Sequence, residues 1–259
     1  MEKSSFRNAA ILAAKAAGQI HQNYFGRKIK IKTKDTEINR VTCVDVLAQK
    51  KIVSILKKHF PTHGFLGEEN LDSLRGAEYV WIIDPLDGTS NFSHKIPIFS
   101  VSIALAFKEK IILGVVFDPC KNELFVAEKG KGATLNGRKI KVTNNFDWEN
   151  LIASTGFGYE RGQLMKKNIK NIEVLLSKSV LDLRRMGSAA LELCYVACGR
   201  FDAYWEYELN PWDFSAGKLI VEEAGGQVSD FKNREVNLTL GSVIATNGVV
   251  HKRFLDLFC

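Results

Sequence analysis

The chain contains 259 residues, of which 46% are hydrophobic and 25% are charged, as in ordinary folded globular proteins. No apolar run approaches the roughly 20 residues that cross a membrane, and the first residues lack the apolar core of a signal peptide, so we expect a cytoplasmic protein without a membrane partner. The five cysteines are an odd number without a C-x-x-C pair, which disfavours a disulfide framework. The formal net charge of +7 fits either an anionic ligand, nucleic acid included, or a solvated lysine-rich surface.

The first part of the chain carries two helical patterns and then a series of strands. Apolar residues recur at helical spacing from Phe6 to Tyr24 and again from Thr42 to Phe60, where Pro61 closes the pattern. Between these helices, residues 28–33 alternate apolar and basic side chains, as an exposed strand does. Further strands are predicted at Phe65–Glu69, Tyr79–Ile83, Ser100–Phe107, Ile111–Phe117 and Glu123–Ala127.

The second part of the chain mixes helices and strands. In chain order, the predicted elements are strand Leu151–Thr155, helices Gln163–Ser177 and Ser188–Cys198, strand Phe201–Tyr207, helix Phe214–Ala224, strand Ser242–Ala245 and helix Lys252–Phe258. Because helices and strands are interspersed without strict alternation, we predict a layered α/β or α+β architecture. A polar stretch at 143–150 suggests one domain, 1–259, made of two packed halves at about 1–145 and 146–259.

Two carboxylates stand at the end of the predicted strand Tyr79–Ile83. Asp84 follows the strand directly, and Asp87 comes after Pro85 and Leu86. Gly88 and three residues that favour helix N-caps come next, so the acids lie where a strand stops and a helix begins. Buried carboxylates this close repel each other unless a proton or a cation lies between them. The pattern therefore predicts a site for a hard divalent metal beside a helix N-terminus that could receive an anion.

Further acids lie at the ends of other predicted elements. Asp45 falls in the first turn of a helix, Glu68 follows Gly67 at a strand end, and Asp213 falls at a helix start. Any one of these alone is more simply a partner of the helix dipole or a surface acid. The five histidines are scattered and H-E-x-x-H is absent, so oxygen ligands favour Mg²⁺ or Mn²⁺ over Zn²⁺. The phosphate-loop, dinucleotide-binding and nucleophile-elbow patterns are absent as well.

Seven segments together resemble the inositol monophosphatase family. DPLDGTSNF at 84–92 resembles its first signature, and WDFSAG at 212–217 with EEAGG at 222–226 resembles its second. Four further blocks match in the expected order: VTCVD at 41–45, GEE at 67–69, RMGSAAL at 185–191 and GRFDAYWE at 199–206. The resemblance covers nearly the whole chain. Its small departures, Ser90 where threonine is common and Asn70 after the acid pair, fall on no expected ligand.

The resemblance implies an αβαβα sugar-phosphatase fold of the inositol monophosphatase and fructose bisphosphatase type. It implies a Mg²⁺-dependent, Li⁺-sensitive phosphomonoesterase that converts myo-inositol 1-phosphate, or a related sugar monophosphate, to the alcohol and phosphate. Two ions are implied, with a weaker third near Glu68 and Mn²⁺ as the alternative metal. The implied ligands are Glu68, Asp84 and the Leu86 carbonyl for the first ion, and Asp84, Asp87 and Asp213 for the second.

The resemblance also implies roles around the metals. Thr89 and Asp45 would activate the nucleophilic water, with Glu68 taking part in catalysis. Gly88 and Thr89 would contact the phosphate. The hydroxyls of the sugar or inositol would meet Gly187, Ser188, Ala189 and Glu206, with Asp213 also on the substrate side. From the residues alone, Gly187–Ala189 is equally a helix N-cap, and Glu206 could be a surface acid on a strand.

Alternatives stay open at this point. Within the enzyme class, fructose-1,6-bisphosphatase, alone or as a second activity, is the nearest rival, and nucleotide 3′-phosphatase is a weaker one. An interaction protein is the alternative from another class, because some bacterial relatives serve in RNA or RNA-polymerase complexes and the charge is basic. Dimers are frequent among relatives, so the resemblance implies a homodimer. Specificity lies in loops that sequence cannot place.

Overall fold

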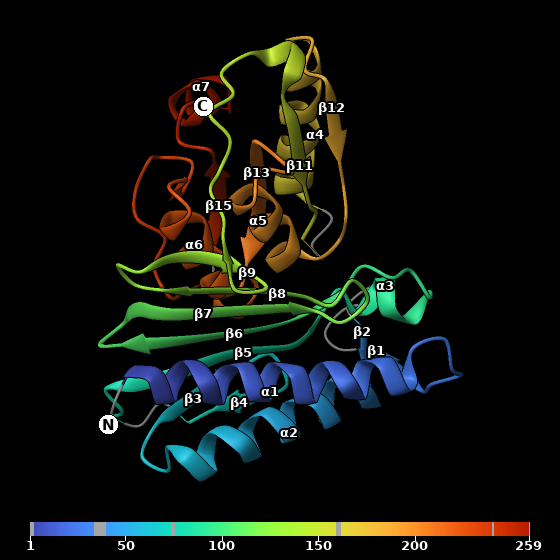
Figure 1. Ribbon diagram of the computed structural model, residues 1–259. Helices are drawn as coiled ribbons and strands as arrows, with labels where there is room; N and C mark the ends of the chain where they lie inside the picture. Colours follow the sequence, from blue (N-terminus) through green and yellow to red (C-terminus); the bar gives the residue numbers. More distant parts are fainter. Residues whose placement is uncertain (1–2, 34–39, 74–75, 159–161, 240, 259) are drawn as a thin grey trace.

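The computed structural model describes residues 3–33, 40–73, 76–158, 162–239 and 241–258. In these ranges the chain forms alternating layers of helix and sheet (Figure 1). Helices α1 (Lys3–Tyr24) and α2 (Cys43–His59) form one outer layer, and α4 (Gln163–Leu176) and α7 (His251–Phe258) form the other. Helices α5 (Ala189–Ala197) and α6 (Pro211–Glu223) lie between two sheets. The predicted αβαβα architecture is confirmed.

The larger sheet belongs to the first half of the chain. Its eight strands lie in the order β10-β9-β8-β7-β6-β5-β3-β4, with β3 parallel to β5 and every other pair antiparallel. One face packs against α1 and α2 through a core that includes Ala13, Ala17 and Trp81. The strands are β3 (Gly64–Gly67), β4 (Leu71–Asp72), β5 (Tyr79–Asp87), β6 (Ser100–Phe107), β7 (Lys110–Asp118), β8 (Glu123–Glu128), β9 (Gly132–Leu135) and β10 (Arg138–Lys139). A separate ribbon pairs β1 (Ile31–Thr33) with β2 (Arg40–Thr42).

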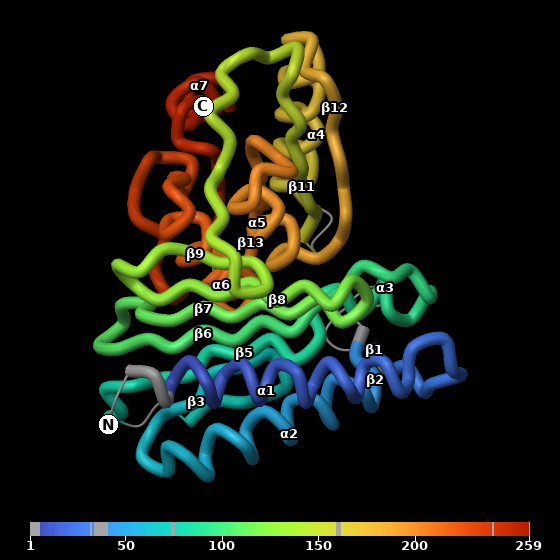
Figure 2. Tube along the Cα trace, viewed as in Figure 1, coloured from blue at the N-terminus to red at the C-terminus, as the bar shows by residue number. Residues whose placement is uncertain are grey.

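The smaller sheet belongs to the second half. Its order is β12-β11-β13-β15-β14, with β11 parallel to both neighbours and β15 antiparallel to both of its own. In Figure 2 the chain leaves β10 and runs as one segment to this sheet; α5 and α6 then lie between the two sheets. The strands are β11 (Ile152–Thr155), β12 (Asp182–Arg184), β13 (Ala203–Leu209), β14 (Gln227–Ser229) and β15 (Gly241–Thr246), after a 3-10 turn at Trp148–Asn150.

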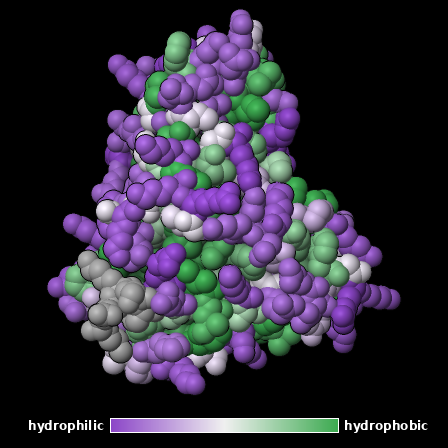
Figure 3. Space-filling model, in the orientation of Figure 1, coloured by the Kyte–Doolittle hydropathy of each residue, from purple (hydrophilic) through white to green (hydrophobic). Residues whose placement is uncertain are grey.

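One face of the molecule can be described from its hydropathy. On the face shown in Figure 3, hydrophilic residues predominate, and hydrophobic residues appear between them as separate patches. None of the helices in the described ranges combines the length and the apolar character needed to cross a membrane.

The structure differs from the predicted elements mainly at the acid pair and at short edge strands. Strand β5 does not stop before Asp84, because pairing with β6 resumes at Asp87 opposite Ser100 after an irregular register between the two acids. Pro85 has no N–H to donate there. The following helix α3 (Thr89–Ser93) has only five residues. Strands β9 and β10 were not predicted: both are short, and β9 begins at Gly132, which pairs with Glu128 of β8.

Candidate active site at the meeting of the two halves

The acid pair lies at the carboxyl end of β5, inside the protein. Asp84 is 2% exposed and Asp87 is 8% exposed, and both belong to the strand beside α3. The backbone N–H of Leu86 donates to Asp84 Oδ1 at 3.0 Å, which folds the Pro85–Leu86 turn around the carboxylate. The short segment between the acids therefore holds two desolvated carboxyl groups on one strand end.

Glu68 and Asp213 bring negative charge to the same place. Burial raises the pKa of Asp84 well above its ordinary value, and the charges of Glu68, Asp87 and Asp213 raise it further. The pKa of Asp213 is raised in the same way, first by burial and then by Glu68 and Asp87. These effects act between acids that are far apart in the sequence, since Glu68 directly follows β3, Asp84 and Asp87 lie on β5 and Asp213 lies on α6.

The cluster is not yet arranged as a metal cage. In the described ranges, no three His, Cys, Asp or Glu side chains already meet at the spacing of a metal site. The donor chemistry nevertheless suits a hard cation, because all the groups are oxygens and their repulsion is relieved by positive charge. Hydrogen bonds within the described ranges fall on Oδ1 of Asp84 and Oδ2 of Asp213, which leaves one oxygen of each for a ligand.

Thr89 lies one turn from the acid pair and is bonded to a carboxylate of another helix. Its hydroxyl is 2.9 Å from Asp45 Oδ1 and 3.0 Å from the Leu86 carbonyl oxygen, so it can donate to either. Asp45, fully buried, also accepts at Oδ2 from the backbone N–H and the hydroxyl of Thr42. Burial raises the pKa of Asp45 to about 6, Thr42 opposes the rise, and Glu68 adds to it. The arrangement gives a threonine hydroxyl an adjacent, fixed proton acceptor.

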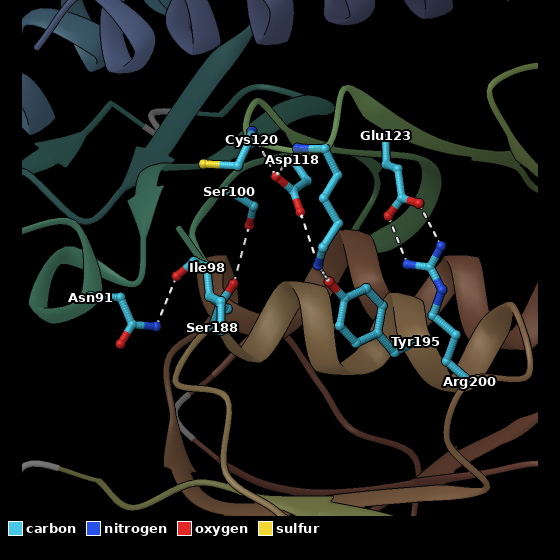
Figure 4. A network of polar contacts seen from close by, with 10 residues as sticks. Asn91, Ile98, Ser100, Asp118, Cys120, Glu123, Ser188, Tyr195 and Arg200 are labelled. Atoms are coloured by element: carbon cyan, nitrogen blue, oxygen red, sulfur yellow. Dashed lines mark hydrogen bonds and ion pairs between the residues drawn. The ribbon is translucent and has the colours of Figure 1, made fainter. Parts of the chain in front are cut away.

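Asp87 joins the two halves of the molecule. Its Oδ2 accepts from the Ser188 hydroxyl at 2.5 Å and from the Ala190 N–H at 2.9 Å, so it caps α5 from the other half. Ser100 contacts both Asp87 and Ser188, and Figure 4 shows Ser100 above the start of α5. Burial raises the pKa of Asp87 to about 6 against the opposing effect of these donors. A negative charge at a helix N-terminus is favourable, which offsets part of the burial cost.

The predicted substrate residues fall into two groups: Gly88 with the 187–189 segment, and Glu206 on the smaller sheet. Gly88 lies against the loop of Gly187, since a Cβ on Gly88 would come within 3.2 Å of the Gly187 carbonyl oxygen. Ser188 and Ala189 begin α5 and are buried beside Asp87. The structure therefore brings Gly88 and the 187–189 segment together.

Glu206 lies on β13, 8% exposed, and is not a surface acid. The Tyr204 hydroxyl donates to its Oε2 at 2.6 Å. Burial raises the pKa of Glu206 to about 7, while Tyr204 and the positive charge of Arg185 oppose the rise. Gly156 leaves the room that this carboxylate fills, because a Cβ there would lie 1.8 Å from Glu206 Oε2. Glu206 thus points from the smaller sheet toward the charges of Arg185 and Asp87.

Sequence reasoning missed several residues that hold this site. Thr42 fixes Asp45 through a capping box, and the T-x-x-D spacing could have revealed it. Ser100 contacts the start of α5 from a position with no distinguishing pattern, and Asn91, which contacts the preceding loop, lies in the signature at 84–92 but was given no role there. A cavity of about 480 Å³ lies elsewhere: it is lined by residues that include Tyr207, Phe231 and Ser242, and none of the predicted site residues lines it. Concavity alone would therefore have pointed away from the predicted site residues.

Comparison with known proteins decides the family. The sequence profile described as "Inositol monophosphatase family" matches residues 2–259. The chain belongs to the inositol monophosphatase family. The buried acids, Thr89 and Asp45 thus occupy the segments by which the chain resembled this family.

Individual members of the inositol monophosphatase family agree over the full length. A Pseudomonas aeruginosa relative, named Nus factor SuhB, is 42% identical over 254 residues, which are 96% of this chain and 93% of the relative. The structure of the extragenic suppressor protein suhB from Bartonella henselae has a TM-score of 0.93 at 35% identity, with 98% of each chain covered. The inositol monophosphatase from Anabaena has a TM-score of 0.88 at 37% identity, covering 98% of this chain and 95% of that one.

Proposed function

We propose that this protein is a cytoplasmic Mg²⁺-dependent phosphomonoesterase that hydrolyses myo-inositol 1-phosphate or a related sugar monophosphate. The observation that carries the proposal is the group of Glu68, Asp84, Asp87 and Asp213: Asp84 and Asp87 are buried, and neighbouring acids of the group raise the pKa of Asp84 and Asp213 beside a hydrogen-bonded Thr89. Two buried acids and two half-buried acids that repel one another have no structural advantage at this place. They suit a site that receives cations and a phosphate.

The metals would be held by the carboxylates already named. Glu68, Asp84 and the Leu86 carbonyl would hold one Mg²⁺, and Asp84, Asp87 and Asp213 the other, with a weaker third ion near Glu68 and Mn²⁺ as the alternative. When bound, such ions neutralise the ester and lower the pKa of a coordinated water. The Leu86 carbonyl oxygen lies 3.0 Å from Thr89 Oγ1, and with the Thr89 hydrogen directed to Asp45 its lone pairs would be left for a ligand.

Thr89 and Asp45 would accept the proton of the attacking water. With its own hydrogen directed to Asp45 Oδ1, Thr89 Oγ1 presents lone pairs that accept a hydrogen from the attacking water. Thr42 fixes Asp45 in the orientation that receives the threonine proton. Asp45 is therefore the terminal base, and Thr89 transfers the proton to it.

The two halves would bind different ends of the substrate. Gly88 and Thr89 at the start of α3 would contact the phosphate, and the Gly187–Ala189 segment with Glu206 would contact the hydroxyls of the alcohol. The buried position of Glu206 supports a polar ligand on its side of the site. We further propose that residues 1–259 act as one phosphatase unit of two packed halves, and that two copies form a homodimer.

The test is phosphate release from a panel of esters. Myo-inositol 1-phosphate, fructose 1,6-bisphosphate and a nucleotide 3′-phosphate are compared with Mg²⁺, with EDTA and with added Li⁺. We expect Mg²⁺-dependent, Li⁺-inhibited release that is fastest from the inositol ester. Equal release from fructose 1,6-bisphosphate would favour a dual-activity enzyme, and no release from any ester would refute the proposal.

A second role is favoured by one observation. Relatives from Pseudomonas aeruginosa and Escherichia coli, 42% and 41% identical, carry the name Nus factor SuhB. We propose that this chain also contacts RNA or RNA polymerase, with its net charge of +7 contributing to that contact. A fluorescent RNA and purified bacterial RNA polymerase are the probes. Salt-sensitive binding that persists in Asp87→Asn is expected, and no binding to either probe at low salt contradicts this role.

A further inference from the structure

The loop that precedes α5 is held from both sides by residues without a role in the proposed chemistry. Its central residue is Met186, immediately before the Gly187–Ala189 segment. The Met186 N–H donates to Glu192 Oε1 at 2.8 Å, and the Met186 carbonyl oxygen accepts from Asn91 Nδ2, also at 2.8 Å. Both backbone groups of one residue are thus bonded to side chains, one from each half of the molecule.

Glu192 is buried and accepts a hydrogen bond from outside its own helix, which its position near a helix start does not explain. An acid in the first turn of a helix usually interacts with the dipole of that helix and remains in water. Glu192 is instead 0% exposed, and its Oε1 accepts from an N–H outside the helix. Its second oxygen is buried with no hydrogen-bond partner in the described ranges. An unpartnered buried carboxylate oxygen lowers stability, so the residue is not explained by core packing.

Asn91 completes the arrangement from α3. Its amide nitrogen donates to the Ile98 carbonyl at 2.8 Å as well as to Met186, so its orientation is fixed from within its own half; Figure 4 shows the Ile98 contact. Gly187 follows in a left-handed conformation with φ +84, and a Cβ there would lie 3.2 Å from Asn91 Nδ2. The loop therefore lies directly on the Asn91 amide.

We propose that Asn91 and Glu192 are positioning residues that clamp the Met186 peptide and thereby fix the Gly187–Ala189 backbone for a polyol leaving group. This inference rests on the proposed phosphatase function and deepens it. The clamp acts on the alcohol side of the substrate, while the acid cluster and Thr89 act on the phosphate side. Loss of the clamp should therefore weaken binding of esters whose alcohol carries hydroxyls and spare esters whose alcohol does not.

The kinetic test compares two esters in matched variants. Glu192→Met keeps the volume and removes the acceptor, Glu192→Gln keeps an acceptor oxygen, and Glu173→Met alters an exposed acid on α4 as a control. For Glu192→Met we expect KM for myo-inositol 1-phosphate to rise at least tenfold, with kcat/KM for phenyl phosphate changed less than threefold. Glu192→Gln and the control should resemble the wild type. An unchanged ratio between the esters, or equal effects of Met and Gln, would overturn the proposal.

Two further measurements keep the test decisive. Asn91→Ala removes the other contact, and the same selective rise in KM is expected if Glu192→Met does not fold. Hydrogen exchange of the Met186 amide does not depend on activity: it should be at least tenfold faster in Glu192→Met than in Glu192→Gln or the wild type. Equal exchange in all three contradicts the clamp. A wild type that hydrolyses neither ester refutes the proposed function and leaves the clamp to be judged by exchange.

Discussion

Replacement of Gly156 by alanine should disturb the substrate side of the site without altering any acid. The added Cβ would lie 1.8 Å from Glu206 Oε2 and 2.3 Å from its Cδ, so the carboxylate has to move and lose the 2.6 Å bond from Tyr204. A hydrogen bond to a charged group contributes about 1.5–3 kcal/mol and overpacking costs about 1–3 kcal/mol. We expect the free energy of unfolding to fall by about 3 kcal/mol, which lowers Tm by roughly 6–12 °C.

The assay combines thermal unfolding with kinetics. Gly158→Ala is the matched control, because the nearest atom to its Cβ would be Glu208 Oε2, at 3.1 Å, at the end of a flexible side chain, and Tm should change by less than a few degrees. If Glu206 contacts the substrate hydroxyls, Gly156→Ala also raises KM for myo-inositol 1-phosphate. In a Glu206→Ala background the alanine has space, so its cost should largely disappear. The reasoning is refuted if Gly156→Ala unfolds at the wild-type temperature, or if its cost is the same in both backgrounds.

The remaining predictions concern the acids, the hydroxyl and a distant histidine. Asp84→Asn removes a buried, repelled charge, so phosphate release should fall by at least about two orders of magnitude while Tm in EDTA stays equal or rises. The control is Asp182→Asn, at a half-exposed acid that is ion-paired with Arg184, and retained turnover in Asp84→Asn contradicts the ligand assignment. Thr89→Val removes the hydroxyl and should lower kcat by about 100-fold or more, with KM little changed. Thr89→Ser keeps the hydroxyl and should retain most of the wild-type kcat. Similar kcat values in the two variants would exclude a proton-transfer role. Burial lowers the pKa of His251 to about 4 from its ordinary 6.5, and the unfolded chain therefore takes up its proton first. The contribution of His251 to the free energy of unfolding is complete above about pH 6.5 and declines as the pH falls toward 4, by roughly 2 kcal/mol after allowance for screening. Chemical denaturation at pH 7.5 and 4.5 should show a smaller loss of unfolding free energy in His251→Gln than in the wild type. An identical loss in the two proteins would contradict this origin.

Much of the fold was predictable because its signals are local. Strand Ser100–Phe107 appears with the predicted bounds, since a long apolar run between charged residues has few alternatives. The ends of β5 were not predictable, because resumption of pairing at Asp87 depends on where β6 lies. Short polar edge strands such as β12 were missed for the same reason: neighbouring strands, not their own composition, define them.

The site divides along similar lines. Asp84 and Asp87 were suspected from their spacing, but the approach of Asp45 to Thr89, 44 residues away, came only from the family resemblance. The metal-ligand and substrate roles of these residues stay predictions. Asn91 lies in the signature at 84–92 but was read only as a residue that favours helix N-caps, and Glu192 gave no signal, because a glutamate near a helix start is ordinary. Their importance depends on Met186, which is 95 and 6 residues away from them respectively.

The capping of α5 by Asp87 has a consequence for how the protein matures. A nascent chain that has emerged only as far as the larger sheet already carries Asp45, Glu68, Asp84 and Asp87, yet the donors Ser188 and Ala190 are still to be synthesised. Until the ribosome has released α5 and α6, Asp87 is without these donors and Asp213 is missing. Catalytic competence would then arise in a single late step of synthesis, and truncated translation products would be inert.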